Sequence, residues 1–404
     1  MKKTFLSAFL PAAMPMQAPL SPSAHGLKKV SLLAAAMLLC VTAHAGKRSD
    51  DVLKTAQKVN DYFMATYADP CADTFVKKRR TSNLWTRAVY YEGLMALYDI
   101  DHDQRYLDYT DLWGNYHKWD VRNGITTRDA DNQCCGQTYL MRYVATGNKA
   151  MMEPLKANLD AQMSEKRYDY WTWIDAIQMS MPVYAQMYRI TGKDKYIKTA
   201  WKMYEWTRNT CGKNSVHKRG GLFNTKTGLW WRDKDFVPPY QEQDGKDCYW
   251  SRGNGWVYAA LVRTMSQLPA KSKYHKKFLA DFLAMSFAIK ACQRPDGFWN
   301  VSMVSPTTFG GPETSGTALF LYGICWGINN GYLSSDDFLP VAQRAWDALQ
   351  TVVHDDGFLG YVQGTGKEPK DGQPVTFDSK PDFEDYGTGC FLLGACEYIK
   401  LLLK

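Results

Sequence analysis

The sequence predicts an all-α protein, an (α/α)6 barrel of six helical hairpins. Three observations lead to this fold: two kinds of helical segment alternate along the chain, similar glycine-containing turns connect them, and no Pro-rich or Ser-rich linker interrupts residues 46–404. We therefore expect one domain over residues 46–404, preceded by a segment of different character over residues 1–45.

Segments of the first kind carry small and aromatic residues at helical spacing and few charges, which is typical of helices that are covered on most sides. They are the expected inner helices of the barrel. The six segments are Leu84 to Tyr98, Gly136 to Thr146, Ile174 to Thr191, Gly255 to Leu268, Ser315 to Asn329 and Gly387 to Leu401.

Segments of the second kind are amphipathic and rich in Lys, Asp and Tyr, as expected of outer helices with one face in water. They lie before or between the first kind. The six segments are Asp50 to Tyr67, Gln104 to Lys118, Lys149 to Met163, Asp194 to Arg208, Lys273 to Cys292 and Asp336 to Val353.

The connections between segments repeat as well. Thr146-Gly147-Asn148-Lys149 resembles Thr191-Gly192-Lys193-Asp194, in which a glycine ends one helix and a polar residue starts the next. A closed ring leaves no hairpin with an uncovered apolar face, so we favour a barrel. An open helical solenoid is the alternative, although solenoid repeats are usually more uniform in length than these.

Residues 1–45 contain no Asp or Glu, and an apolar run from Val30 to Val41 follows Lys28-Lys29. Together with the small residues of Ala43-His44-Ala45, this order predicts a secretory signal peptide and a mature chain that starts near Gly46. The expected destination is the periplasm.

Two further features of this segment bear on processing. Residues 1–25 precede the basic stretch that normally opens a signal, so we interpret them as an upstream extension from an alternative start codon. Cys40 would be a lipid-modified cysteine in the alternative interpretation, but Met37-Leu38-Leu39 lacks the small residue expected before such a site.

The charge of the chain argues against nucleic acid as a partner. The formal net charge is +8, and it falls to +4 without the four lysines that precede Gly46. Nucleic-acid binding normally requires a clustered basic face, which this mild excess does not predict. The apolar run before residue 46 is also too short to span a bilayer comfortably.

Cysteine and histidine spacing predicts neither a metal site nor a cofactor. Nine of the ten cysteines follow residue 45, none in a C-x-x-C pair, and the seven histidines are scattered. No H-E-x-x-H, G-x-S-x-G, P-loop or dinucleotide glycine motif occurs. A disulfide between Cys211 and Cys248 stays open.

Candidate catalytic residues lie just before the inner helices, where the helix starts of such a barrel meet at one rim. Asp131 and Asp175 are carboxylates near Trp and Tyr, and Trp173 lies two residues before Asp175. Aromatic faces pack on sugar rings, and a carboxyl in a partly dry site has a raised pKa that lets it donate a proton. The alternative for Asp129 and Asp131 is a helix N-cap. For Asp175, which precedes an apolar run, burial without a purpose would be costly.

Arg252 lies between Trp250 and Trp256 and is followed by Gly253, so we expect its guanidinium to bind an anionic group in two-point fashion. An internal salt bridge is the alternative, with Glu313 as the candidate partner. The long loop from Asn209 to Trp250 is expected to form a lid or a short hairpin around Gly221 to Trp231.

The same motifs resemble glycoside hydrolase family 105, in order along nearly the whole of residues 46–404. The most specific strings are W-S-R-G-N-G-W at Trp250 to Trp256 and E-T-S-G-T at Glu313 to Thr317. The other matching segments are Asp129 to Tyr139, Trp173 to Ala176 and Gly360 to Gln363.

This resemblance implies an (α/α)6 barrel that removes a 4,5-unsaturated uronic acid from the non-reducing end of polysaccharide-lyase products. It implies hydration of a vinyl ether, in which a proton is added at C4 and water at C5. The implied roles are Asp175 as general acid and base and Asp131 as its companion carboxylate. Sugar binding is implied for Arg252, Trp250, Trp256, Trp173, Gln137, Thr314 and Ser315.

The chain departs from the family pattern in two places. Trp230-Trp231-Arg232-Asp233 stands where some rhamnogalacturonan-active relatives have His-Gly-Trp-Asp, which leaves the sugar of the next subsite open. Asn132 stands where some members have a second acid. Two other functions stay open: an inverting glycosidase acting on saturated glycans with Asp131 and Asp175, and a non-catalytic glycan-binding protein.

Overall fold

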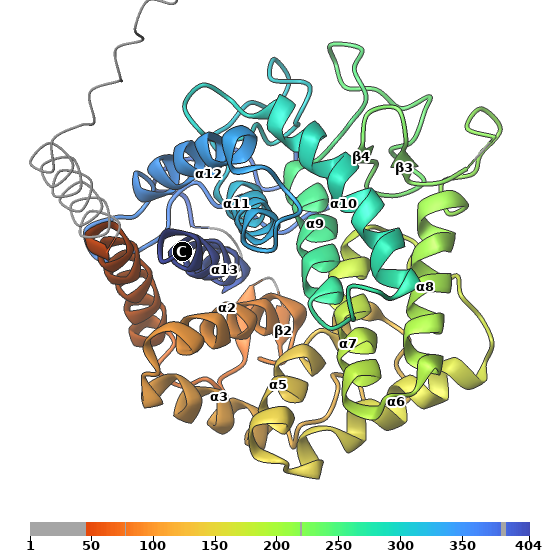
Figure 1. Ribbon diagram of the computed structural model, residues 1–404, viewed down its shortest axis with the longest axis vertical. Coiled ribbons are helices and arrows are strands. Elements are labelled where there is room, and N and C mark those ends of the chain that lie inside the picture. The colour runs from red at the N-terminus through yellow and green to blue at the C-terminus, as the bar shows by residue number, and fades with distance from the viewer. Residues whose placement is uncertain (1–45, 77, 219, 381–384) are drawn as a thin grey trace, which may run out of the picture. The chain divides into compact units, whose positions relative to one another are not determined.

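A ring of helices surrounds the centre of the unit formed by Arg48–Lys404 (Figure 1). The structure is a computed structural model that describes residues 46–404 except 77, 219 and 381–384. The remaining unit, Met1–Lys47, therefore lies almost wholly outside the described residues, and so do the predicted signal segment and Cys40.

Six inner helices line the ring in the described part of the chain, each within a few residues of its predicted bounds. The second inner helix differs in one respect, because the short helix α4 (Ala130–Gln133) precedes it. The inner helices are α2 (Trp85–Asp101), α5 (Gly136–Thr146), α7 (Asp175–Thr191), α9 (Ser251–Met265), α11 (Thr314–Asn329) and α13 (Asp385–Leu402).

The ring is closed, because the last inner helix packs against the first. Neighbours contact one another in the order α2, α5, α7, α9, α11 and α13, and α13 returns to α2. At this seam the two backbones touch: a Cβ added to Gly389 would lie 2.2 Å from the carbonyl oxygen of Val89. The closed arrangement confirms the predicted barrel and rules out the open solenoid.

The outer helices alternate with the inner helices along the chain and cover the ring. After the helix at residues 46–66 they are α3 (Gln104–Tyr116), α6 (Glu153–Ser164), α8 (Asp194–Asn209), α10 (Lys273–Cys292) and α12 (Ser335–Gln350). A 3-10 turn, η1 (Lys149–Met151), leads into α6. Each presents its apolar stripe to the inner ring and its charged stripe to solvent, as the amphipathic pattern predicts.

Helix ends lie where the sequence signals place them. Gly147 and Gly192 adopt the left-handed conformation, with φ of 71° and 67°, at the ends of α5 and α7. Asp103 caps α3 by accepting the N–H of Arg105 at 2.9 Å. Such caps satisfy backbone groups that the helix itself leaves without partners.

A buried ion pair fastens the seam between α2 and α13. The Nε of Arg87 donates to Oδ2 of Asp385 at 2.7 Å, and both side chains are at most 2% exposed. Losing one partner of such a pair would leave an uncompensated charge in the interior, so the pair specifies how the first and last inner helices meet.

Two small antiparallel hairpins accompany the helices. The first joins β1 (Thr74–Val76) to β2 (Lys78–Arg80), and the second joins β3 (Phe223–Asn224) to β4 (Leu229–Trp230). The second confirms the hairpin expected around Gly221 to Trp231. Asn254 of α9 holds it in place, accepting the N–H of Trp230 at 2.8 Å and donating to its carbonyl at 3.1 Å.

All nine cysteines in the described residues are free thiols, so the disulfide considered between Cys211 and Cys248 is wrong. Cys211 instead donates to the carbonyl of Thr172 at 3.3 Å, and Cys248 is buried elsewhere.

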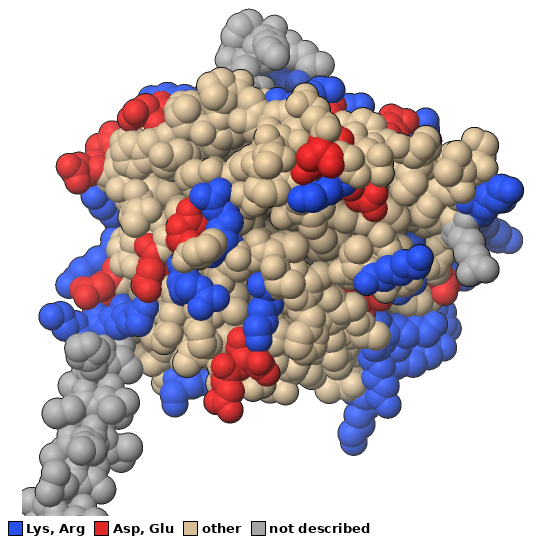
Figure 2. All heavy atoms as spheres, turned by 90° about the horizontal axis from the view of Figure 1, so that it is seen from above, with Lys and Arg blue, Asp and Glu red and all other residues tan. Residues whose placement is uncertain are grey.

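Among the described residues, none of the helices combines the length and apolar character needed to cross a bilayer. Figure 2 shows scattered groups of Lys and Arg, several of them beside Asp or Glu, on a face that is mostly covered by other residues.

Candidate active site

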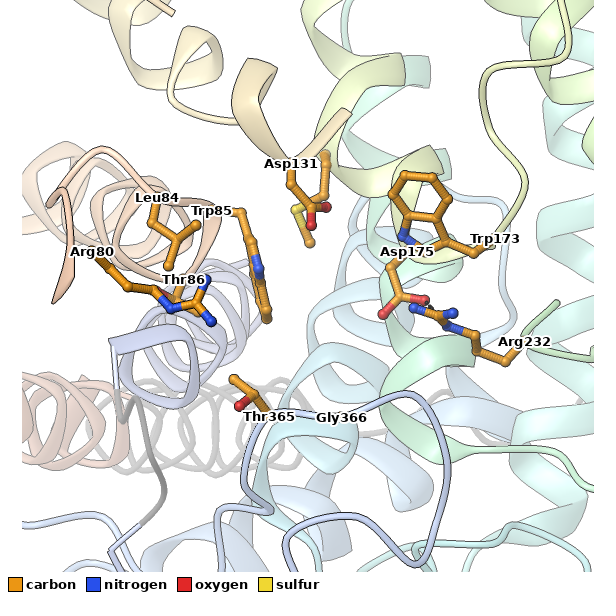
Figure 3. A pocket seen from close by; sticks show the side chains of 11 residues that line it. Arg80, Leu84, Trp85, Thr86, Asp131, Trp173, Asp175, Arg232, Thr365 and Gly366 are labelled. Carbon is orange, nitrogen blue, oxygen red and sulfur yellow. Dashed lines mark hydrogen bonds and ion pairs between the residues drawn. The ribbon is translucent and has the colours of Figure 1, made fainter. Parts of the chain in front are cut away.

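A cavity of about 210 Å³ opens at the end of the ring where α4 and α7 begin (Figure 3). Ligand pockets for larger molecules are commonly about 300–1,000 Å³, so this one suits a single sugar ring at a chain end. Its lining residues are Arg80, Leu84, Trp85, Thr86, Asp131, Trp173, Asp175, Met179, Arg232, Thr365 and Gly366.

Asp131 reaches the cavity from the first turn of α4. The cap of this helix is Asp129, whose Oδ1 accepts the N–H of Asp131 at 3.0 Å. Asp129 therefore has the capping role considered for it, while the carboxyl of Asp131 points into the cavity (Figure 3). The N-cap interpretation, considered for both acids, therefore applies to Asp129 and not to Asp131.

Asp175 reaches the same cavity as the first residue of α7. The preceding residues are fixed to the segment after β4: Trp173 forms a backbone bridge with Asp233, and the N–H of Ile174 donates to the carbonyl of Arg232 at 3.0 Å. The side chain of Asp175 is 11% exposed. The two carboxylates, brought from positions 44 residues apart, thus share one site beside the indole of Trp173 (Figure 3).

Arg232 is the cation beside this pair, a role that was not predicted from the sequence. Its Nε donates to Oδ2 of Asp175 at 3.1 Å, and its Nη1 donates to Oδ2 of Asp233 at 2.7 Å. The expected pair of carboxylates is therefore a cluster of two carboxylates and one guanidinium.

Asp131 is the carboxyl with the raised pKa. Burial raises the pKa of Asp131 to about 7, and the negative charges of Asp129 and Asp175 add to the effect, against the lowering by Arg232 and Arg122. A carboxyl with this pKa holds its proton near neutral pH and can act as a general acid. The site therefore places a carboxyl that holds its proton near neutral pH in the same cavity as a second carboxyl that contacts a guanidinium.

Replacing Asp131 by Asn is expected to stabilise the protein above neutral pH. Because the folded-state pKa is about 7 and the ordinary value is 3.8, the folded state holds a proton that the unfolded state has lost between these pH values. Stability therefore falls as pH rises through this window. Since water can enter the cavity and screen the charge, we expect a gain of about 1–2 kcal/mol at pH 8.

Urea denaturation at pH 8 and pH 5 measures this effect. The gain should be smaller at pH 5, where the wild-type carboxyl is protonated in the folded state. Asp169→Asn, which changes an exposed carboxylate paired with Arg167, serves as the control and should show no comparable dependence on pH. Equal gains for Asp131→Asn at both pH values would contradict the raised pKa.

The structure corrects the predicted role of Arg252. The side chain is 1% exposed, and its Nη1 and Nη2 donate to the carbonyls of Gln363 and Gly364 at 2.8 and 2.7 Å. It lies against the rings of Trp250 and Tyr386. The partners of this guanidinium are therefore two backbone carbonyls and not Glu313, the alternative partner considered for it.

Arg252 and Trp250 instead shape the loop that completes the cavity. Trp250 donates its indole N–H to Oε1 of Gln363 at 2.8 Å, and the amide nitrogen of Gln363 donates to three carbonyls further along the same loop. The loop thereby brings Thr365 and Gly366 to the cavity wall. Arg252 and Trp250 therefore affect the site indirectly, because they fix the loop that carries Thr365 and Gly366.

The other predicted binding residues also lie behind the cavity wall, which corrects their expected contact with sugar. Trp256 and Gln137 are fully buried, and Gln137 bonds to Gln178 and Arg263. Thr314 donates to the carbonyl of Gly360, and Ser315 donates to Glu313, the cap of α11. Trp173 is the predicted binding residue that does line the cavity.

Besides Arg232, four polar or aromatic lining residues were not predicted from the sequence: Arg80, Trp85, Thr86 and Thr365. Trp85 and Thr86 begin the first inner helix, so the rule that selected the other helix starts applied to them as well. Arg80 ends β2 and Thr365 lies in a loop, where helical periodicity gives no signal.

A second buried acid with a raised pKa, Glu92, lies on the inner helix α2. Glu92 of α2 is fully buried, accepts the amide N–H of Gln178 at 2.8 Å and lies 3.4 Å from Nε of Arg263. The thiol of Cys134 donates to its other oxygen at 3.6 Å. Burial raises the pKa of Glu92 to about 7 despite Arg263. This network joins three inner helices behind the site.

Within the described residues, no cluster of three or more His, Cys, Asp or Glu side chains has a geometry that could hold a metal ion. What the cavity offers chemically is a proton donor, a carboxylate, guanidinium groups and aromatic faces. Those groups suit proton transfer to an anionic sugar.

The sequence and the fold match known proteins over nearly the whole described region. Residues 55–402 match the family described as Glycosyl Hydrolase Family 88. An unsaturated 3S-rhamnoglycuronyl hydrolase from Formosa agariphila is 29% identical, covering 78% of this chain and 84% of the relative. A protein of the same name from an Alteromonas species is 28% identical, covering 80% of this chain and 79% of the relative. The solved structure of a glycosyl hydrolase family 88 protein from Bacteroides vulgatus is similar with a TM-score of 0.77 and 33% identity, covering 87% of this chain and 99% of the other.

Proposed function

Because the chain belongs to glycosyl hydrolase family 88, we propose that it removes a 4,5-unsaturated uronic acid from the non-reducing end of oligosaccharides released by polysaccharide lyases. The observation that carries this proposal is the cavity itself, in which Asp131, Asp175 and Arg232 surround space for one sugar ring. A cavity for a chain end and a cation for a carboxylate are what such a substrate requires.

The proposed reaction is hydration of the ring's vinyl ether. A carboxyl of the Asp131 and Asp175 pair delivers a proton to C4, and positive charge develops at C5 and the ring oxygen. Water then adds to C5 while a carboxylate of the pair accepts its proton, so one molecule of water is added in all. The resulting hemiketal opens and the partner sugar leaves. Because no attack occurs at the anomeric carbon, the carboxylate spacings of ordinary glycosidases do not apply.

The source polysaccharide is the finer part of the proposal. Two relatives are named for unsaturated 3S-rhamnoglycuronyl units, which supports a rhamnose-linked unsaturated uronate as the first substrate to test. Arg80, on the wall opposite Arg232, adds positive charge to the cavity (Figure 3). Pectic rhamnogalacturonan, ulvan-like glycans and arabinogalactan side chains digested by lyases form the panel.

Loss of ultraviolet absorbance tests the activity. Hydration destroys the conjugated double bond, so absorbance should fall as the purified protein acts on an unsaturated disaccharide of the panel. An inverting glycosidase acting on saturated glycans would release reducing sugar from saturated chains and leave the absorbance unchanged. A glycan-binding protein would bind without either change. Either result would overturn the proposal.

We also propose that the protein works in the periplasm, where lyase products of modest size would reach it. The basic pair at Lys28-Lys29 and the apolar run from Val30 to Val41 support export. Cell fractionation, with mass determination of the mature N-terminus, tests this location. A lipid-modified Cys40 at the N-terminus would instead support a membrane-anchored form.

A further inference from the structure

We propose that Arg232 is an exchangeable counter-ion, which pairs with Asp175 in the free protein and passes to the carboxylate of the unsaturated uronate when substrate binds. Asp175 therefore loses its counter-ion only in the complex with substrate. In that complex it takes up the proton that it then delivers to C4. The inference rests on the proposed function and adds a residue to it.

Arg232 is held more closely by Asp233 than by Asp175. Its contact with Asp233 is the shorter one, at 2.7 Å, and Asp233 does not line the cavity. Asp233 is itself fixed, since its Oδ1 accepts the N–H of Asp235 at 2.8 Å. The contact with Asp175, at 3.1 Å, lies at the cavity surface. Arg232 is therefore anchored on one side and accessible on the other.

The N–H donors of Arg232 decide where a ligand carboxylate would bind. A guanidinium has five N–H donors, and a carboxylate binds best to two that point the same way. Among the described residues, the guanidinium of Arg232 donates only to Asp175 and Asp233. Because Nη1 is held by Asp233, the edge formed by Nε and Nη2 is the one that a carboxylate would take. Nε is the atom now bonded to Asp175, so an incoming carboxylate displaces Asp175.

The carboxylate of the proposed substrate lies next to its reacting double bond. In a 4,5-unsaturated uronate the carboxylate carbon is bonded to C5, at one end of the reacting double bond. A cation that binds this carboxylate must therefore lie close to the acid that protonates C4. Arg232 meets that condition with Asp175 at 3.1 Å, whereas Arg80 lies on the opposite wall (Figure 3).

The exchange changes the charge around Asp175. The charged groups on the packed elements are Asp131 and Asp129 of α4, Arg122 before α4, Arg80 of β2, and Asp233 beside Arg232. With Arg232 on the substrate, Asp175 faces a second carboxylate without its own cation, which favours its protonated form. The proton comes from Asp131 below about pH 7 and from solvent above it.

Two substrates that differ at the carboxylate test the exchange by kinetics: an unsaturated uronyl disaccharide and its methyl ester, which keeps the double bond. We expect the wild type to prefer the free acid in kcat/KM. Arg232→Gln should lower kcat/KM for the acid by about 10- to 100-fold, the loss expected for hydrogen bonds to a charged group, and change the ester far less. Arg167→Gln, which changes an exposed arginine paired with Asp169, is the matched control.

Proton uptake tests the second half of the proposal. Glucuronate is titrated calorimetrically at pH 8 in two buffers of different ionisation enthalpy, with methyl glucuronate as the neutral probe. Binding of glucuronate to the wild type should be accompanied by uptake of as much as about one proton per molecule bound. Binding of glucuronate to Arg232→Gln, or of the ester to the wild type, should be accompanied by close to none.

The outcomes separate the inference from the function it rests on. An inactive wild type with intact fold overturns the proposed function. An active wild type in which Arg232→Gln slows acid and ester equally, or changes neither, overturns the exchange. If Arg232→Gln fails to fold by circular dichroism, Arg232→Lys, which keeps the charge and loses the two-point fork, provides the same acid-to-ester comparison.

Discussion

Asp175→Asn is expected to lower kcat for an unsaturated disaccharide by about 1,000-fold and to leave binding of the disaccharide within a few-fold of the wild type. The amide has nearly the shape of the carboxyl but can neither donate an acidic proton nor accept one from water. Removal of a positioned acid and base commonly costs about 100- to 10,000-fold. Loss of ultraviolet absorbance measures kcat, and calorimetry measures binding.

Asp235→Asn is the control for this variant. Asp235 lies in the segment that follows Arg232, and its exposed side chain pairs with the exposed Lys234. Its activity should match that of the wild type. Turnover by Asp175→Asn at the wild-type rate would remove Asp175 from the mechanism and leave Asp131 as the acid, in agreement with its raised pKa.

Gly389→Ala is expected to destabilise the protein by about 3 kcal/mol, in the upper part of the range for overpacked cores. The added Cβ would lie 2.2 Å from the carbonyl oxygen of Val89 and 2.8 Å from Cα of Tyr90, both backbone atoms of α2. Side chains can rotate away from a clash, but here α2 and α13 themselves must separate. Chemical denaturation at neutral pH measures the loss.

Gly310→Ala is the comparison for this second variant. Gly310 lies in a loop, and its added Cβ would have 3.2 Å to the nearest heavy atom, a backbone oxygen that a loop can move. Its stability should change by less than about 1 kcal/mol. Wild-type stability for Gly389→Ala would show that the seam is looser than the close approach of the two backbones indicates.

Much of the fold could be predicted because hydrophobic periodicity is a local property. The segment from Gln104 and the segment from Lys273 begin where α3 and α10 begin, and both connecting glycines end their helices as expected. The start of α9 was placed at Gly255 instead of Ser251, because two glycines in the first turn are poor helix formers. Packing against α7 and α11 outweighs that preference. The family resemblance was confirmed by the match over residues 55–402.

The site was less predictable, because its contents depend on which residues far apart in sequence meet. Asp131, Asp175 and Trp173 were found from helix starts, and all three line the cavity. Arg232 follows a hairpin 57 residues beyond Asp175, and nothing local indicates that they pair. The prediction for Arg252 relied on its sequence neighbours, which are typical of a binding site. Its hydrogen-bond acceptors, however, are carbonyls of residues 363 and 364, which are far away in the sequence.

The meeting of the first and last inner helices also has a consequence for biosynthesis. A chain emerging from the ribosome exposes the apolar side of α2 long before α13 exists to cover it, since some 300 positions separate Arg87 from Asp385. Every contact across that junction is formed late and over a long stretch of polymer, which slows assembly relative to bundles built from neighbouring hairpins. A nascent molecule of this architecture therefore depends on protection from aggregation until its final eighteen-residue helix has been made.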